Sequence, residues 1–140
     1  LRLTERIVAE SQLTTMMVSV VDAGTGAGAA IPGYNVAGKT GTARKPQDTG
    51  GYEDAAGNYH YVATFAGFVP AEDPELSMIV VLDEPTSSIY GGEVSAPVFS
   101  QLGQYALARY GIAPPAQLAP VSLPSSAVDP SQDGLGTPVP

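Results

Sequence analysis

Two runs of β-branched and aromatic residues, separated by a short turn, constrain the fold of this chain most. The first run extends from Tyr59 to Val69, and the second, nearly continuous in apolar residues, extends from Leu76 to Leu82. Both compositions are typical of strands, and the second is consistent with a strand covered on both faces. Because the six residues from Pro70 to Glu75 connect the runs, we expect the strands to pair as antiparallel neighbours.

A helix and a further strand are expected before this pair. The helix is predicted from about Glu10 to Asp22, and glycines at positions 24, 26 and 28 end it. Its apolar residues recur at helical spacing and mark the stripe expected to face the core, with the two methionines as core filling: Leu13, Met16, Met17, Val20 and Val21. The strand is predicted from about Tyr34 to Arg44.

A second helix is expected after the strand pair, from about Ser95 to Tyr110, with Pro97 in its first turn and Gly111 as its end. The side expected to pack is traced by Val98, Leu102, Tyr105, Ala106 and Arg109. The order helix, three strands, helix predicts an α/β class of the α+β type, in which helices flank an antiparallel sheet.

The composition narrows the function and divides the chain. A net charge of −8, from 14 acidic and 6 basic residues, argues against nucleic acid or anionic lipid as the main partner. Residues 113–140 hold most of the prolines, no aromatic residue and no Lys or Arg. We therefore expect one domain over residues 1–112 and a Pro-rich, disordered tail over 113–140. The first residue is Leu1, so the chain is expected to be a fragment or a processed product.

One motif match is set aside because its surroundings do not fit. The stretch from Gly33 to Thr40 matches the phosphate-binding pattern G-x-x-x-x-G-K-[ST], and Asp83 and Glu84 follow an apolar run. A P-loop follows a buried strand and opens a helix. Here small residues and Pro32 precede the motif, and Gly41 and Pro46 follow it. The sequence therefore disfavours a P-loop ATPase.

The tetrapeptide Lys39-Thr40-Gly41-Thr42 lies within the predicted strand from Tyr34 to Arg44. Such a strand at a sheet edge could pair with an extended peptide by strand addition. The ammonium of Lys39 and the hydroxyls of Thr40 and Thr42 could hold a carboxylate. Gly41 has no Cβ, which allows a ligand to approach the backbone closely. A peptide that ends in a free carboxylate fits this description.

The same residues resemble a known family. Lys39 to Thr42 is similar to the K-T-G-T element of penicillin-binding proteins and serine β-lactamases. The stretches Val36 to Ala43, Thr64 to Pro70 and Tyr90 to Phe99 resemble class B high-molecular-weight penicillin-binding proteins, in order and spacing. The resemblance implies the C-terminal part of a transpeptidase domain, whose five-stranded antiparallel sheet receives three strands and the closing helix from this chain.

The resemblance also implies an activity and roles for residues. The activity is D-Ala-D-Ala transpeptidation or carboxypeptidation of peptidoglycan stem peptides, with acylation by β-lactam antibiotics. Lys39 would be catalytic, Thr40, Gly41, Thr42 and Ala43 would bind substrate, and one backbone N–H near Thr42 would help to hold the oxyanion. No metal or cofactor is implied. The protein would act at the extracytoplasmic face of the bacterial membrane, anchored by a segment outside this chain, with divisome or elongation proteins as candidate partners.

Two motifs of the family, S-x-x-K with the nucleophilic serine and S-x-N, have no match in this chain. The nucleophile is therefore expected on an N-terminal part of the same protein, which becomes a required partner. A β-lactamase or β-lactam sensor of the same fold, and a non-catalytic module of a cell-wall complex, remain as alternatives. Asp48, Glu53 and Asp54 are expected in a solvated loop, and His60, the only histidine, is expected to have a structural role at a strand end.

Overall fold

The computed structural model describes residues 3–48 and 50–115. The predicted tail over 113–140 lies largely outside these residues. The elements, in chain order, are α1 (Leu3–Asp22), a short 3-10 helix η1 (Ala27–Ala29), β1 (Ala37–Arg44), β2 (Tyr61–Val69), β3 (Leu76–Asp83) and α2 (Gly91–Tyr110). The three strands form one antiparallel sheet in the order β1-β2-β3. The predicted class and strand pairing are confirmed.

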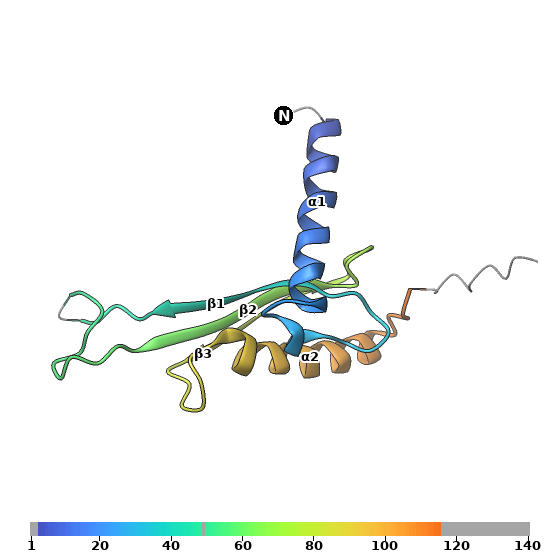
Figure 1. The fold of residues 1–140 in the computed structure, drawn as a ribbon. Helices are drawn as coiled ribbons and strands as arrows, with labels where there is room; N and C mark the ends of the chain where they lie inside the picture. The colour runs from blue at the N-terminus through green and yellow to red at the C-terminus, as the bar shows by residue number, and fades with distance from the viewer. Residues whose placement is uncertain (1–2, 49, 116–140) are drawn as a thin grey trace, which may run out of the picture.

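The two helices lie on opposite sides of the sheet. In Figure 1, α2 runs along one face, whereas α1 rises away from the other side near the beginning of β1. The core lies between α2 and the sheet, where the rings of Phe65 and Phe99 meet edge to face with centroids 4.8 Å apart. No helix among the described residues is long and apolar enough to span a bilayer.

Helix α1 begins earlier than expected, at Leu3 rather than Glu10, and most of its predicted stripe is not buried. Val21 is buried, but Leu13 and Met16 are 55% and 60% exposed. The prediction that both methionines fill a core is therefore wrong for Met16. The helix rises away from the sheet (Figure 1), so Leu13 and Met16 have nothing to pack against within the described residues.

The predicted packing side of α2 is also wrong. Tyr105 is 71% exposed and Leu102 is 51% exposed. The buried side instead consists mainly of small residues: Gly91, Ser95, Ala96, Phe99, Ser100, Gly103 and Leu107. The helix starts at Gly91 rather than Ser95, so Pro97 lies past its first turn.

Hydrogen bonds explain why serines occupy the buried side of α2. Ser95 Oγ donates to the carbonyl oxygen of Ala63 in β2 at 3.0 Å, and Ser100 Oγ donates to that of Ala30 at 2.7 Å. A buried hydroxyl is tolerated where it has such a partner. Small side chains let the helix approach closely, because a Cβ on Gly103 would lie 2.6 Å from Ile31 Cδ1. Hydrophobic periodicity cannot detect this kind of interface.

Strand β3 alternates between covered and uncovered residues, so the expectation that both of its faces are covered is not met within the described residues. Val80 is buried against the α2 side, whereas Ile79 and Val81 on the other face are 66% and 55% exposed. Ala66 of β2 and Lys39 of β1 pair across the sheet in line with Ile79 and are exposed as well. Beyond the place where the end of α1 meets β1, this face of the sheet is uncovered in the described part of the chain.

Charged side chains gather where the loop between β1 and β2 meets the end of β3. Lys45 Nζ lies 2.7 Å from Asp83 Oδ2 and 2.9 Å from Glu84 Oε1. His60 lies between two carboxylates, with Nε2 3.2 Å from Asp54 Oδ2 and Nδ1 3.3 Å from Glu84 Oε2. The sequence indicated no partner for His60, and the structure supplies two. The hydrogen bond to Asp54 is the main cause that raises the pKa of His60.

The packing of α2 predicts a contrast between a buried and a half-exposed apolar residue of the helix. Phe99 is fully buried against Phe65, so Phe99→Ala should lower the free energy of unfolding by about 3–5 kcal/mol. Leu102 is half exposed, so Leu102→Ala should cost less than about 1 kcal/mol. Denaturant unfolding of the two variants measures the difference, and equal costs would contradict the assigned helix face.

The charged cluster predicts the titration of the only histidine. The pKa of His60 should lie above its ordinary value of about 6.5, and Asp54→Asn should lower it. A group whose pKa is raised in the folded state stabilises the fold at pH values below its unfolded-state pKa. This stabilisation is lost as the pH rises through the folded-state pKa. His60→Gln should therefore lower the melting temperature more at pH 5.5 than at pH 8.5. NMR of the imidazole ring and thermal unfolding test both points. A midpoint unaffected by Asp54→Asn would contradict the cluster.

Candidate active site

The tetrapeptide from Lys39 to Thr42 lies in the middle of β1, the edge strand of the sheet. It does not open a helix, which agrees with the rejection of the P-loop match. Among the described residues no strand pairs with the outer edge of β1. The strand therefore offers an open row of backbone groups, as the edge-strand prediction required.

The hydrogen-bonding phase of β1 determines which residues face this open edge. Directly beyond the strand, Lys45 N–H donates to the carbonyl oxygen of His60 at 2.8 Å, in register with the pairs of β1 and β2. In an antiparallel ladder, residues alternate between bonding to the neighbouring strand and pointing away from it. Gly41 and Ala43 share the phase of Lys45 and bond to β2. The backbone N–H and C=O groups of Thr40 and Thr42 therefore point outward.

The side chain of Lys39 reaches the open edge from the far side of the sheet. Side chains alternate along a strand, so Lys39 starts on the uncovered face, beside Met17, Ala66 and Ile79. Its ammonium nevertheless lies 2.9 Å from the carbonyl oxygen of Thr40 and 3.2 Å from Thr40 Oγ1, donating to both. The long side chain thus wraps around the strand and brings its charge to the threonine hydroxyl.

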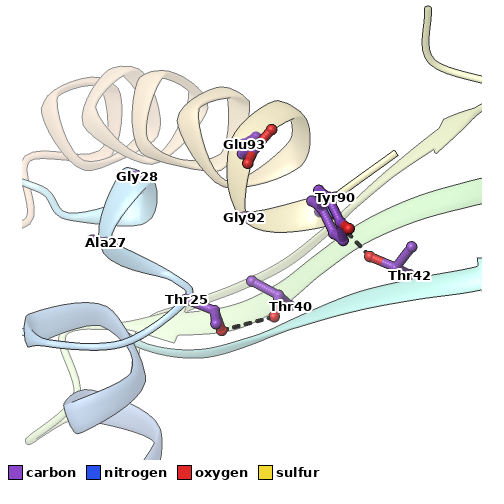
Figure 2. Close-up of a pocket in the computed structure, with 9 residues that line it drawn as sticks. Thr25, Ala27, Gly28, Thr40, Thr42, Tyr90, Gly92 and Glu93 are labelled. Atoms are coloured by element: carbon purple, nitrogen blue, oxygen red, sulfur yellow. Dashed lines mark hydrogen bonds between the residues drawn. The ribbon is translucent and has the colours of Figure 1, made fainter. Parts of the chain in front are cut away.

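The side chains of Thr40 and Thr42 point to the other side of β1, into a cavity of about 440 Å³ between the sheet and the start of α2 (Figure 2). The cavity is lined by Thr25, Ala27, Gly28, Thr40, Thr42, Tyr90, Gly91, Gly92 and Glu93. Thr25 Oγ1 lies 3.1 Å from Thr40 Oγ1, in hydrogen-bond contact. Three threonine side chains from two segments therefore line this cavity.

The N-terminus of α2 closes the opposite side. Gly91 N–H donates to Thr42 Oγ1 at 3.3 Å, which gives the helix a partner that its N-cap residue Tyr90 does not provide. Such a terminus carries a partial positive charge that favours an anion nearby, while Glu93 adds one negative charge to the lining.

Both glycines at the start of α2 are required by close contact. A Cβ on Gly91 would lie 2.1 Å from the carbonyl oxygen of Thr64 in β2, and one on Gly92 would lie 2.1 Å from that of Thr25. Contacts this short with backbone atoms leave no room for any side chain. The glycine pair therefore fixes the width of the cavity.

A close contact within the sheet also requires glycine at position 41, in addition to the approach of a ligand that the sequence indicated. A Cβ on this residue would lie 2.3 Å from Thr64 Oγ1, on the face opposite the cavity. The hydroxyl of the cross-strand neighbour Thr64 thus occupies the space next to Gly41. The glycine lets the two strands pair with this threonine in place.

The structure brings together only part of the predicted site. Lys39, Thr40 and Thr42 meet at the open edge. Ala43 lies on the same face as Lys39, with its backbone bonded to β2, and its side chain does not reach the cavity. Sequence reasoning did not assign Thr25, Tyr90, Gly91, Gly92 or Glu93 to the site. The last four lie in the stretch from Tyr90 to Phe99 that resembles class B penicillin-binding proteins, and that signal could have assigned them.

The lining holds donors but no strong nucleophile. It includes no serine, lysine or histidine side chain, and the described residues contain no cluster of three potential metal ligands. The outward backbone N–H groups, the threonine hydroxyls and the ammonium of Lys39 all favour an extended, anionic ligand. The chemistry of this edge is binding and charge stabilisation, and a reacting group would have to come from elsewhere.

Relatives of this sequence include curated cell-wall proteins. The chain is 43% identical over 128 residues to the probable peptidoglycan D,D-transpeptidase PenA of Neisseria gonorrhoeae. This alignment covers 86% of this chain and 21% of the relative. The chain is 41% identical over 117 residues to the peptidoglycan D,D-transpeptidase FtsI of Escherichia coli, covering 80% and 19%. The chain thus spans about a fifth of the length of these relatives.

Solved structures agree with these relatives. The transpeptidase domain of Burkholderia pseudomallei penicillin-binding protein 3 matches with a TM-score of 0.60 and 40% identity, over 74% of this chain and 30% of that chain. The transpeptidase domain of FtsI4 from Legionella pneumophila matches with a TM-score of 0.56 and 37% identity, over 69% and 34%. The family model for the penicillin binding protein transpeptidase domain matches residues 8–104. The chain therefore belongs to the penicillin-binding protein transpeptidase family.

Proposed function

We propose that this chain forms the substrate-binding edge of a peptidoglycan D,D-transpeptidase whose nucleophilic serine lies on an N-terminal part of the same protein. The observation that carries the proposal is the open edge of β1, where the outward N–H of Thr42 lies beside the hydroxyls of Thr40 and Thr42 and the ammonium of Lys39. The relatives named above supply the reaction class, since their names describe D,D-transpeptidases of peptidoglycan.

The substrate would lie antiparallel or parallel to β1 as an added strand. A stem peptide that ends in D-Ala-D-Ala has a backbone that can bond to the outward groups of Thr40 and Thr42. Its terminal carboxylate would accept hydrogen bonds from the threonine hydroxyls, near the ammonium of Lys39 and the N-terminus of α2. These contacts hold the penultimate carbonyl at a fixed place along the edge.

The reaction would proceed in two acyl transfers. The serine hydroxyl attacks the penultimate D-Ala carbonyl, the amide bond breaks, and D-Ala leaves as an amine after receiving a proton. The amine of a neighbouring stem peptide then attacks the resulting ester, and the serine is released. The negative oxygen of each tetrahedral intermediate would accept a hydrogen bond from the outward N–H of Thr42 and from a second backbone donor outside this chain.

Lys39 would act as the catalytic cation of this edge. Its ammonium already lies at the carbonyl and hydroxyl oxygens of Thr40. In that place a positive charge stabilises both the substrate carboxylate and the negative charge that develops at the reacting carbonyl. A β-lactam, whose ring carbonyl and carboxylate imitate the end of the peptide, would acylate the same serine.

The finer assignments follow from this function. The enzyme would be of the serine type, with carboxypeptidase activity when water replaces the acceptor amine. Since peptidoglycan is assembled outside the cytoplasm, the site would work at the outer face of the membrane, held there by a segment outside this chain. Divisome or elongation proteins would be its partners in the cell.

Replacement of Lys39 tests the proposed role directly. In the complete transpeptidase domain, Lys39→Ala should slow acylation by a fluorescent penicillin by about a hundredfold or more, because the charge that stabilises the transition state is lost. Labelling rates measured on gels give the second-order rate constant. Lys45→Ala is the matched control, since Lys45 pairs with Asp83 and Glu84 away from the cavity, and its rate should change less than about twofold.

Acylation that is unchanged in Lys39→Ala would refute the role of the lysine. Rapid turnover of nitrocefin by the unaltered domain would favour a β-lactamase over a transpeptidase, because a transpeptidase forms a long-lived acyl-enzyme. A domain that neither labels nor turns over nitrocefin would favour a non-catalytic module.

A further inference from the structure

Thr25 approaches the active-site edge from a segment outside the sheet. It follows the end of α1 by three positions, and its hydroxyl oxygen lies 3.1 Å from that of Thr40, as Figure 2 shows. The two residues are 15 positions apart in the sequence. Their contact connects the loop after α1 with the middle of β1.

The backbone around Thr25 is held on both sides. Gly26 N–H donates to the carbonyl oxygen of Val20 at 2.9 Å, which ties the loop to the end of α1. On the other side, the carbonyl oxygen of Thr25 lies so close to Gly92 that no side chain fits between them. Thr25 is therefore placed by α1 and by the N-terminus of α2, and its hydroxyl has a fixed position relative to β1.

The donors and acceptors at Thr40 have a defined direction. A lysine ammonium can only donate, so Thr40 Oγ1 accepts from Lys39. Thr40 and Thr25 then share one further hydrogen bond, in which either hydroxyl can donate. Two hydroxyl protons take part and the bond uses one, so one proton remains for a ligand. Thr42 Oγ1 accepts from Gly91 N–H, which leaves the Thr42 proton for a ligand as well.

This arrangement produces a row of donors with few free acceptors. A carboxylate has two oxygens that only accept, and hydrogen bonds to an ionised group are stronger than those between neutral groups. Without Thr25, the Thr40 hydroxyl would keep its contact with Lys39, but its O–H bond could rotate about the Cβ–Oγ1 bond. Hydroxyl rotation of this kind weakens a binding site whose donors must converge on one anion.

We propose that Thr25 is a positioning residue of the carboxylate subsite, which orients the Thr40 hydroxyl and completes the row of donors formed by Thr25, Thr40 and Thr42. This inference rests on the proposed function and extends it, since it assigns the recognition of the free carboxylate to two separate segments of the chain. A threonine that only joins the loop to the strand would not distinguish ligands by their charge.

The test compares a fluorescent penicillin with its methyl ester in the complete transpeptidase domain. Thr25→Val keeps the shape of the side chain and removes the hydroxyl, and Thr25→Ser keeps the hydroxyl. Thr25→Val should reduce the acylation rate of the free acid about tenfold relative to that of the ester, because one hydrogen bond to an ionised group is weakened. Thr25→Ser should restore the ratio to within about twofold.

Two further measurements separate this role from general damage. Thr86→Val is the matched control, since Thr86 is an exposed threonine of the loop between β3 and α2 that does not line the cavity; it should leave both rates unchanged. Melting temperatures of all variants show whether the fold is preserved. A purely structural role for Thr25 would reduce the rates of acid and ester equally, and this outcome would overturn the proposal.

The outcome also distinguishes this inference from the function on which it depends. If the unaltered domain reacts with neither penicillin, the proposed function fails and the role of Thr25 fails with it. If the unaltered domain reacts and prefers the free acid, but Thr25→Val has the same preference, only the role of Thr25 is overturned.

Discussion

The alternation of backbone hydrogen bonds along β1 is the constraint on which the candidate site depends. The pairing with β2 uses the backbone groups of Lys39, Gly41 and Ala43, and so the groups of Thr40 and Thr42 face outward. A shift of one residue in this register would exchange the two sets and move both threonine side chains to the other face. The register is held by the packing of Phe65, in the middle of β2, against Phe99 of α2. Core packing and the direction of the reactive edge are therefore linked.

Close approach is the second condition, and it is achieved by residues that lack bulk. The start of α2 lies against β2 and the loop of Thr25 because Gly91 and Gly92 have no side chains. Further along the helix, Ser95, Ser100 and Gly103 keep the same short separation from the sheet and from the segment before β1. The result is a narrow cavity in which hydroxyl groups and a helix terminus face each other. Larger apolar residues on this side of α2 would bury more area but would open the cavity.

Strand positions, strand pairing and the placement of Lys39, Thr40 and Thr42 could be predicted from the sequence, because local composition and one short motif determine them. The buried side of α2 could not, since its serines bond to carbonyl groups that are distant in the sequence and apolar periodicity gives them no weight. The stripe of α1 was misjudged for a different reason: Leu13 and Met16 have the correct spacing, but nothing in the described residues covers them. The place of Thr25 at the site could not be predicted from the residues around it, because it depends on a contact with Thr40, 15 positions away.

The route that Lys39 takes around β1 has a consequence for how such a site can be altered. The stem of this side chain rests beside Met17 and Ile79 on the uncovered face of the sheet, and only its charged end arrives at the groove. Whatever packs behind the sheet therefore governs how far the ammonium can extend and how freely it moves. Changes in packing on the rear surface would reach the electrostatics of the front without touching any residue that contacts the ligand.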